Sequence, residues 1–140
     1  MIRIGPEPID LAAMTVAVSR PAHGAICTFL GTTRETSAGD DRLVEALDYE
    51  AYVELARADF EAIVAEARAR WGPLEMAIAH RTGRVALGEA SVAIAVGSPH
   101  RGAAFDACEF AINSLKAKAP IWKRETYRGG DTAWIANTPP

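Results

Sequence analysis

The sequence contains few cysteines and no cluster of residues suited to binding a metal. Only two cysteines, Cys27 and Cys108, occur among the 140 residues, and each lies within an apolar run. A free cysteine packs as a small hydrophobic side chain, so we expect two core thiols rather than a disulfide. No spacing of cysteine, histidine and acidic residues matches that of a zinc site, so we expect no bound metal.

Long apolar runs and an overall positive charge are also missing. No apolar run approaches the ~20 residues that a membrane-spanning helix needs, and the first residues lack the apolar segment of a signal peptide. The net charge of -3 argues against general binding to nucleic acids or to a membrane surface. We therefore expect a cytoplasmic protein with neither nucleic acid nor membrane as a partner. The length is most simply a single domain over residues 1–140.

The charges that are present are unevenly distributed along the chain. Acidic residues dominate residues 35–66, whereas basic residues dominate residues 116–128. A local basic patch within an acidic protein suits a small anionic ligand better than a long polyanion. The basic segment is therefore the first place to look for a binding site.

Hydrophobic periodicity predicts an α+β fold, with helices packed on a mostly antiparallel sheet. We expect strands at residues 2–4, 24–32, 43–52, 76–80, 85–87, 91–96, 121–127 and 132–135. We expect helices at residues 11–18, 54–70 and from about Gly102 to before Pro120. We expect the strand at 24–32 to be buried and residues 33–41 to form a mobile loop. The last helix is expected to bury Phe105, Cys108, Ile112 and Leu115.

This last helix has basic residues at both ends. His100 and Arg101 precede it, where backbone amides and the helix dipole favour an anion. Lys116 lies near its end, and Lys123 follows in the next strand. Because side chains alternate along a strand, Lys123 shares a face with Glu125, while Arg124 points to the opposite face. Only one of Lys123 and Arg124 can therefore line a pocket with Lys116.

A structural role for each of these residues is also open. Both lysines can be solvated charges, and His100 with Arg101 can simply cap the helix. Arg34, after the strand at 24–32, can be a solvated loop residue, and His80, at the end of a strand, can be a structural residue with its hydrogen bonds satisfied. Spacing alone favours these structural roles, since clusters of basic residues also occur where there is no functional site. The residues themselves predict an anion pocket and leave open whether it belongs to a lysine-dependent enzyme.

Several stretches match a known family in order along most of the chain. They are GAICTFLGTTR (24–34), LDYEAY (47–52), RW (70–71), HRTG (80–83), SPHRGAAF (98–105) and LKAKAPIWKRE (115–125). With these motifs the chain resembles the large, catalytic subunit of molybdopterin synthase, the MoaE family. The resemblance implies an α/β hammerhead-like fold and a central homodimer. Each subunit would bind a small ubiquitin-like sulfur carrier with a C-terminal glycine thiocarboxylate, giving a heterotetramer.

The resemblance also implies a reaction and a set of site residues. The enzyme would be a sulfurtransferase that converts cyclic pyranopterin monophosphate, a small pterin substrate, to molybdopterin in molybdenum-cofactor biosynthesis, without a diffusible cofactor. Lys116 and Lys123 would be the catalytic pair, and they would also bind substrate. The further substrate-binding residues would be Arg34, His100, Arg101, Arg124 and Glu125.

Two other functions remain as alternatives. A docking module for a ubiquitin-like protein would need no chemistry at Lys116. A His/Lys phosphoesterase would use His100, but it would want a second histidine or a nucleophile with its base. The chain closes at residues 137–140 without the charged tail that the resemblance leads us to expect, so we assign this end no role.

Overall fold

The computed structural model describes residues 1–136, so the closing segment 137–140 lies outside the described residues. The strands are β1 (Ile2–Gly5), β2 (Ala25–Thr32), β3 (Val44–Ala51), β4 (Glu75–Arg81), β5 (Gly83–Ala86), β6 (Ala90–Ser98), β7 (Ile121–Tyr127) and β8 (Thr132–Ile135). The helices are α1 (Leu11–Val18), α2 (Val53–Trp71) and α3 (Arg101–Lys118). These bounds confirm the predicted order of elements and the α+β class.

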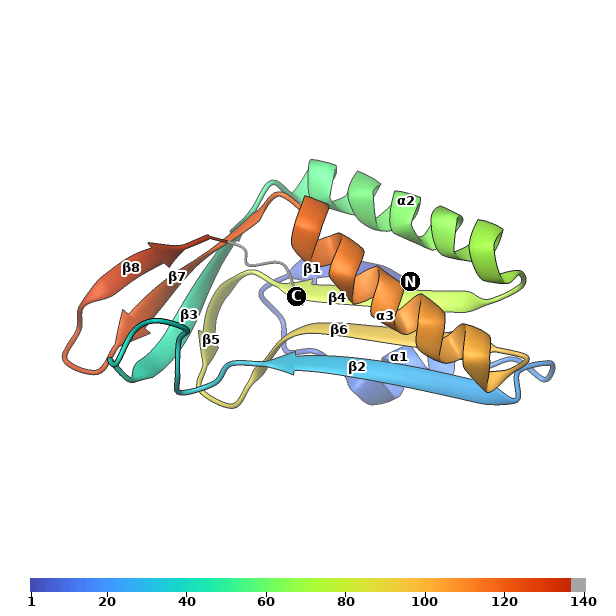
Figure 1. Cartoon of the computed structure of the whole chain (residues 1–140), viewed down its shortest axis with the longest axis horizontal. Coiled ribbons are helices and arrows are strands. Elements are labelled where there is room, and N and C mark those ends of the chain that lie inside the picture. Colours follow the sequence, from blue (N-terminus) through green and yellow to red (C-terminus); the bar gives the residue numbers. More distant parts are fainter. Residues whose placement is uncertain (137–140) are drawn as a thin grey trace.

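The strands form two sheets rather than one (Figure 1). Sheet one has the order β1-β4-β6-β2, and only its β1–β4 pair is parallel. Sheet two has the order β5-β3-β7-β8 and is antiparallel throughout. The short strand β5, which follows β4 in the chain, already belongs to sheet two. The chain therefore crosses between the sheets within the β4–β5 turn.

All three helices pack on sheet one. In Figure 1, α2 and α3 lie on one of its faces and α1 on the other. The α2/α3 side holds the larger core, in which Phe60 of α2 packs near Ile78 and Ile94 of the sheet. None of the helices within the described part of the chain is long and apolar enough to cross a membrane.

The α1 side of sheet one is built from small side chains. Its buried positions on β4 and β6 are alanines, namely Ala77, Ala79, Ala93 and Ala95, which pack under Met14 and Val18. Gly97 continues this row, and a Cβ atom there would lie only 2.0 Å from the carbonyl oxygen of Val18. The short helix can therefore approach the sheet closely. Asp10 caps the N-terminus of this helix, because its carboxylate accepts a hydrogen bond of 2.9 Å from the Ala13 amide.

Two predicted burial patterns are wrong. The strand β2 is not buried, because it forms the edge of sheet one and its outer face exposes Ile26 and Leu30. On α3, Phe105 is 62% exposed instead of buried. The buried row of α3 consists mainly of small residues, since the helix packs against both β2 and β6, and it comprises Ala104, Ala107, Cys108, Ala111 and Leu115.

Candidate functional site

A cavity of about 350 Å³ opens where the two sheets meet. Sheet one contributes Ser91 at the start of β6, and sheet two contributes Tyr49, Lys123 and Glu125. The last turn of α3 adds Lys116, and the loop after β2 adds Arg34 and residues 36–38. The cavity is therefore formed by segments from across the whole sequence, and its lining is more polar than the core on either side.

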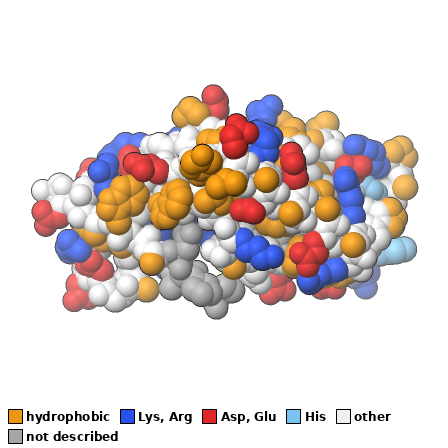
Figure 2. Space-filling model, turned by 90° about the horizontal axis from the view of Figure 1, so that it is seen from above, with side chains coloured by type: hydrophobic (Ala, Val, Ile, Leu, Met, Phe, Trp, Pro, Cys, Tyr) orange, Lys and Arg blue, Asp and Glu red, His pale blue; other side chains and the backbone are white. Residues whose placement is uncertain are grey.

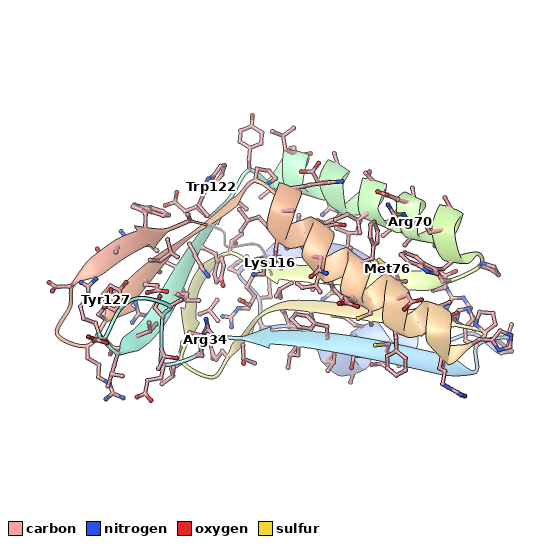
Figure 3. The ribbon with its side chains drawn as sticks, viewed as in Figure 1. Arg34, Arg70, Met76, Lys116, Trp122 and Tyr127 are labelled. Carbon is pink, nitrogen blue, oxygen red and sulfur yellow. The ribbon has the colours of Figure 1, made fainter. Side chains whose placement is uncertain are left out.

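Three basic side chains line this cavity: Arg34, Lys116 and Lys123. Figure 3 shows Arg34 and Lys116 at the junction between the sheets. Within residues 1–136, none of the three forms an ion pair with a carboxylate. Three cations without anionic partners around one cavity make a site for an anionic ligand.

The ammonium of Lys116 is held in a setting that disfavours its charge. Burial lowers the pKa of Lys116, and the positive charge of nearby Lys123 lowers it further. A lysine with a lowered pKa has a larger neutral fraction near pH 7, so it can accept a proton or act as a nucleophile. Lys116 therefore has the electrostatic setting of a reactive amine.

The alternation predicted for β7 is confirmed. Lys123 and Glu125 face the cavity, whereas Arg124 lies on the opposite face. There Arg124 pairs with Asp48 at 4.0 Å, and its guanidinium lies 5.8 Å from the centre of the Trp134 ring. Within a single subunit, Arg124 therefore lies away from Lys116 and Lys123.

Glu125 is the acidic side chain of this cavity. It is buried, and no hydrogen bond is made to its Oε2 atom among the described residues. It lies on the same strand face as Lys123, two residues away. A buried carboxylate beside unpaired cations can balance part of their charge or orient a hydrogen-bond donor of a ligand.

His80, on β4, lies behind this cavity. Its Nδ1 atom is 2.8 Å from the carbonyl oxygen of Arg81, so Nδ1 carries the proton of the neutral ring. Burial lowers the pKa of His80 to about 4, and the charge of Lys116 adds to this effect. The ring is therefore neutral near pH 7, in keeping with the structural role that the sequence favours.

Sequence reasoning missed Tyr49 and Ser91. The Tyr49 hydroxyl donates a hydrogen bond of 3.1 Å to Ser91 Oγ, and both residues line the cavity. Pairing the strand at 43–52 with that at 121–127 could have indicated Tyr49, because it lies directly opposite Lys123. Ser91 has no comparable signal, since its position depends on how the two sheets meet.

The loop that carries Arg34 is attached to sheet two. Glu35 forms an ion pair of 2.6 Å with Arg128, which follows β7. Further along, the Arg42 guanidinium lies 3.9 Å from the centre of the Tyr127 ring. These contacts hold both ends of the loop beside the β7–β8 hairpin, and thereby hold Arg34 at the rim of the cavity.

His100 and Arg101 lie at the other end of α3. Lys116 lies fifteen positions after Arg101, which corresponds to about 22 Å along a helix. Both residues are exposed, and the His100 side chain makes no capping hydrogen bond. A single chain therefore does not bring them to Arg34, Lys116 and Lys123.

The cavity is suited to an anion rather than to a metal ion. Within the described residues, no group of three or more histidine, cysteine, aspartate or glutamate side chains is arranged to hold one. The lining residues supply three cations, one carboxylate and the hydroxyl groups of Thr32, Thr36, Ser37, Tyr49 and Ser91. They can bind a phosphate or carboxylate group and place a reactive amine beside it.

Sequence comparison and structure comparison match this chain to the same group of proteins. The sequence model of the family described as "MoaE protein" matches residues 4–118. A molybdopterin synthase catalytic subunit from Thermoplasma volcanium is 43% identical over 128 residues, which cover 91% of this chain and 90% of that protein. One from Arabidopsis thaliana is 45% identical over 93% of this chain, which spans 64% of the length of that relative.

Solved structures show the same fold. The molybdopterin synthase structure from Staphylococcus aureus has a TM-score of 0.89 and 34% identity, and covers 95% of each chain. A MoaE protein from Burkholderia ambifaria has a TM-score of 0.82 and 38% identity, covering 98% of this chain and 90% of that one. These matches extend over nearly the whole chain, including the segments that build the cavity. The chain belongs to the MoaE protein family.

Proposed function

We propose that this chain is the catalytic subunit of a molybdopterin synthase. It would act as a sulfurtransferase that converts cyclic pyranopterin monophosphate to molybdopterin, with sulfur supplied by the thiocarboxylate of a small carrier protein. The observation that carries the proposal is the convergence of Arg34, Lys116 and Lys123, without carboxylate partners, on one cavity. Relatives that cover most of this chain bear the name of that catalytic subunit.

The three cations suit the charges of this reaction. A cyclic phosphate and a thiocarboxylate are both anions, so bringing them together requires compensating positive charge. Arg34 would bind the phosphate, since a guanidinium matches phosphate oxygens with two parallel hydrogen bonds. Lys123 would stay charged and lie near the thiocarboxylate. Lys116 would transfer protons or stabilise the carrier-linked intermediate, because its pKa is lowered.

A surface for the carrier adjoins the cavity. Trp122 and Trp134 are 52% and 55% exposed and line a groove of about 420 Å³ on the outer face of sheet two. Ile135 lines both this groove and the cationic cavity, so the two adjoin each other at the end of β8. Figure 2 shows hydrophobic side chains grouped on this side of the molecule. We propose that the body of the carrier covers the two tryptophans while its extended C-terminus reaches Lys116.

A homodimer would give His100 and Arg101 a place in the site. The free edge of β2 is eight residues long and carries neither charge nor proline, so nothing on it opposes pairing with a second copy. Its Ala25 end lies beside the start of α3, where the Gly24 amide bonds the Pro99 carbonyl at 3.3 Å. Its other end leads to Arg34.

Antiparallel pairing of two β2 edges would therefore set one copy's α3 start beside the other copy's cavity. Arg101 of the partner subunit would then approach Arg34 and the phosphate. With one carrier on each subunit, the assembly would be a heterotetramer. The reaction would take place in the cytoplasm, where the free thiols Cys27 and Cys108 would remain reduced.

The experiment that tests this function is the conversion of the cyclic precursor in vitro. Purified protein, thiocarboxylated carrier and precursor should yield molybdopterin, and the Lys116→Ala variant should bind the carrier without forming product. A phosphoesterase would instead release inorganic phosphate without the carrier. A docking module would bind the carrier equally well with or without Lys116 and would form no product in either case.

A further inference from the structure

Tyr49 links the two sheets at the cationic cavity. Its backbone belongs to β3 in sheet two, where it lies directly opposite Lys123 of β7. Its hydroxyl, however, donates to Ser91 Oγ on β6 of sheet one at 3.1 Å. Ser91 in turn donates to the Gly31 carbonyl of β2 at 3.5 Å. A short chain of hydrogen bonds thus runs from sheet two into the edge of sheet one.

The ring of Tyr49 is fixed by sheet one as well. It meets the His80 ring edge to face, with the ring centres 5.0 Å apart and the planes at 74°. His80 is itself held by the hydrogen bond from Nδ1 to the Arg81 carbonyl. Tyr49 is only 6% exposed. Its side chain is therefore positioned by sheet one, although its backbone is part of sheet two.

The two lysines are divided between the same two parts of the molecule. Lys116 is carried by α3, which packs on β2 and β6 of sheet one. Lys123 is carried by β7 of sheet two. The distance between their ammonium groups therefore depends on how the sheets are placed against each other. Within residues 1–136, the other side-chain hydrogen bond between strands of the two sheets runs from Arg81 to the Arg84 carbonyl at 3.3 Å; it lies at the β4–β5 turn and does not involve the cavity.

We propose that Tyr49 is a positioning residue of the enzyme: its hydrogen bond to Ser91 fixes sheet two against sheet one and so holds Lys123 at the working distance from Lys116. This inference rests on the proposed function for its catalytic consequence. The role in spacing the lysines follows from the contacts alone.

Loss of the Tyr49 hydroxyl has a defined electrostatic consequence. The groups that face Lys116 are Lys123 from β7 and His80 from β4, while Arg34, Glu125 and the Tyr49 hydroxyl line the same cavity. Of these, Lys123 is the charge that acts on Lys116. If the sheets separate here, Lys123 moves away and water enters, and both changes favour the charged form of Lys116. The pKa of Lys116 should therefore rise.

The test measures Lys116 directly, without substrate. The variants Tyr49→Phe, Ser91→Ala and their double variant are labelled with an amine-reactive reagent across a pH series, and modification of Lys116 is followed by peptide mass spectrometry. Tyr52→Phe is the matched control, because Tyr52 is 60% exposed and lines no part of the cavity. We expect the Lys116 labelling curve of each single variant to move to higher pH. The double variant should move no further than either single variant, and the control should match the wild type.

Turnover gives the second measurement. Because a misplacement of about 1 Å can cost a factor of about 100, we expect kcat of Tyr49→Phe to fall by roughly tenfold while KM changes little. Wild-type labelling curves and wild-type kcat in both single variants would overturn the inference. A shifted Lys116 curve in a protein that forms no molybdopterin would overturn the proposed function and leave the spacing role intact.

Discussion

Lys116, at the end of α3, and Lys123, on β7, face the same cavity, and the charge of Lys123 helps to lower the pKa of Lys116. The two residues are only seven positions apart in the sequence, yet they belong to different layers of the fold. Their proximity is thus a tertiary property, and most of the predictions below depend on it.

The first prediction concerns Lys116 itself. Replacement by alanine should lower kcat by at least about a hundredfold, the range typical of a lost acid–base group. Carrier affinity and the circular dichroism spectrum should stay as in the wild type, since Lys116 makes no ion pair with any other described residue. Lys118→Ala, on the exposed side of the same helix turn, is the control and should be fully active. Appreciable turnover by Lys116→Ala would remove this residue from the mechanism.

The second prediction concerns the pH dependence of turnover. If neutral Lys116 accepts a proton, kcat rises with pH through the lowered pKa of that amine. Replacing Lys123 by methionine removes a nearby positive charge, which raises the pKa of Lys116 and moves this limb of the profile to higher pH. The measurement is the kcat profile of the variant at saturating substrate. A limb that stays in place would mean that the profile reports a different group.

The third prediction concerns stability in acid. The folded chain holds His80 neutral down to a pKa of about 4, whereas the same residue in the unfolded chain titrates at its ordinary value of 6.5. Between these values the unfolded state binds more protons, so stability falls as the pH falls. His80 should account for a loss of about 2 kcal/mol between pH 6.5 and pH 5.

Urea unfolding at these two pH values measures the effect of His80. The variant His80→Gln has no titrating ring and should lose correspondingly less stability over the interval. An equal loss in the variant and the wild type would assign the acid sensitivity to other groups.

The fourth prediction concerns carrier binding. Because exposed tryptophans at the centre of an interface commonly contribute more than 1 kcal/mol each, Trp122→Ala and Trp134→Ala should each weaken binding by about tenfold. Phe105→Ala is a matched control, since Phe105 is an equally exposed aromatic residue on α3, away from the groove. Isothermal titration with the carrier provides the dissociation constants. Unchanged values for both tryptophan variants would place the carrier elsewhere.

The fifth prediction tests the shared site of the proposed homodimer. Lys116→Ala and Arg101→Ala should each be inactive as pure dimers. A mixed dimer of the two variants has one cavity with an intact Lys116 facing an intact partner Arg101, so it should regain about half of the wild-type activity per dimer. Mixed dimers without activity would show that Arg101 acts within its own chain or not at all. Leu30→Lys on the β2 edge should weaken the dimer, whereas Val16→Lys on α1 should not.

Much of the site could be read from the sequence because strand alternation is a local rule. It placed Lys123 and Glu125 together and Arg124 apart, and the structure confirms this arrangement. The helix that ends near Lys116 was also predictable from periodicity and Pro120. The same local rules do not predict contacts between the two sheets, which is why sequence reasoning missed Tyr49 and Ser91.

The errors in burial have the same origin. The apolar sequence of β2 predicts a buried strand, but burial depends on neighbouring strands, and among the described strands β2 pairs with β6 alone. On α3, the predicted buried row that includes Phe105 and the observed buried row of alanines both fit helical periodicity. Because α3 packs closely on β2, the small alanines face the sheet. The distance between helix and sheet cannot be predicted from a local sequence pattern.

The attachment of the Arg34 loop has a consequence for ionic strength. The ion pair between Glu35 and Arg128 is exposed, and exposed ion pairs weaken as salt screens their charges. The rim of the cavity should therefore be held most firmly in dilute buffer. Salt would act on phosphate binding twice, by screening Arg34 from the ligand and by loosening the segment that presents it.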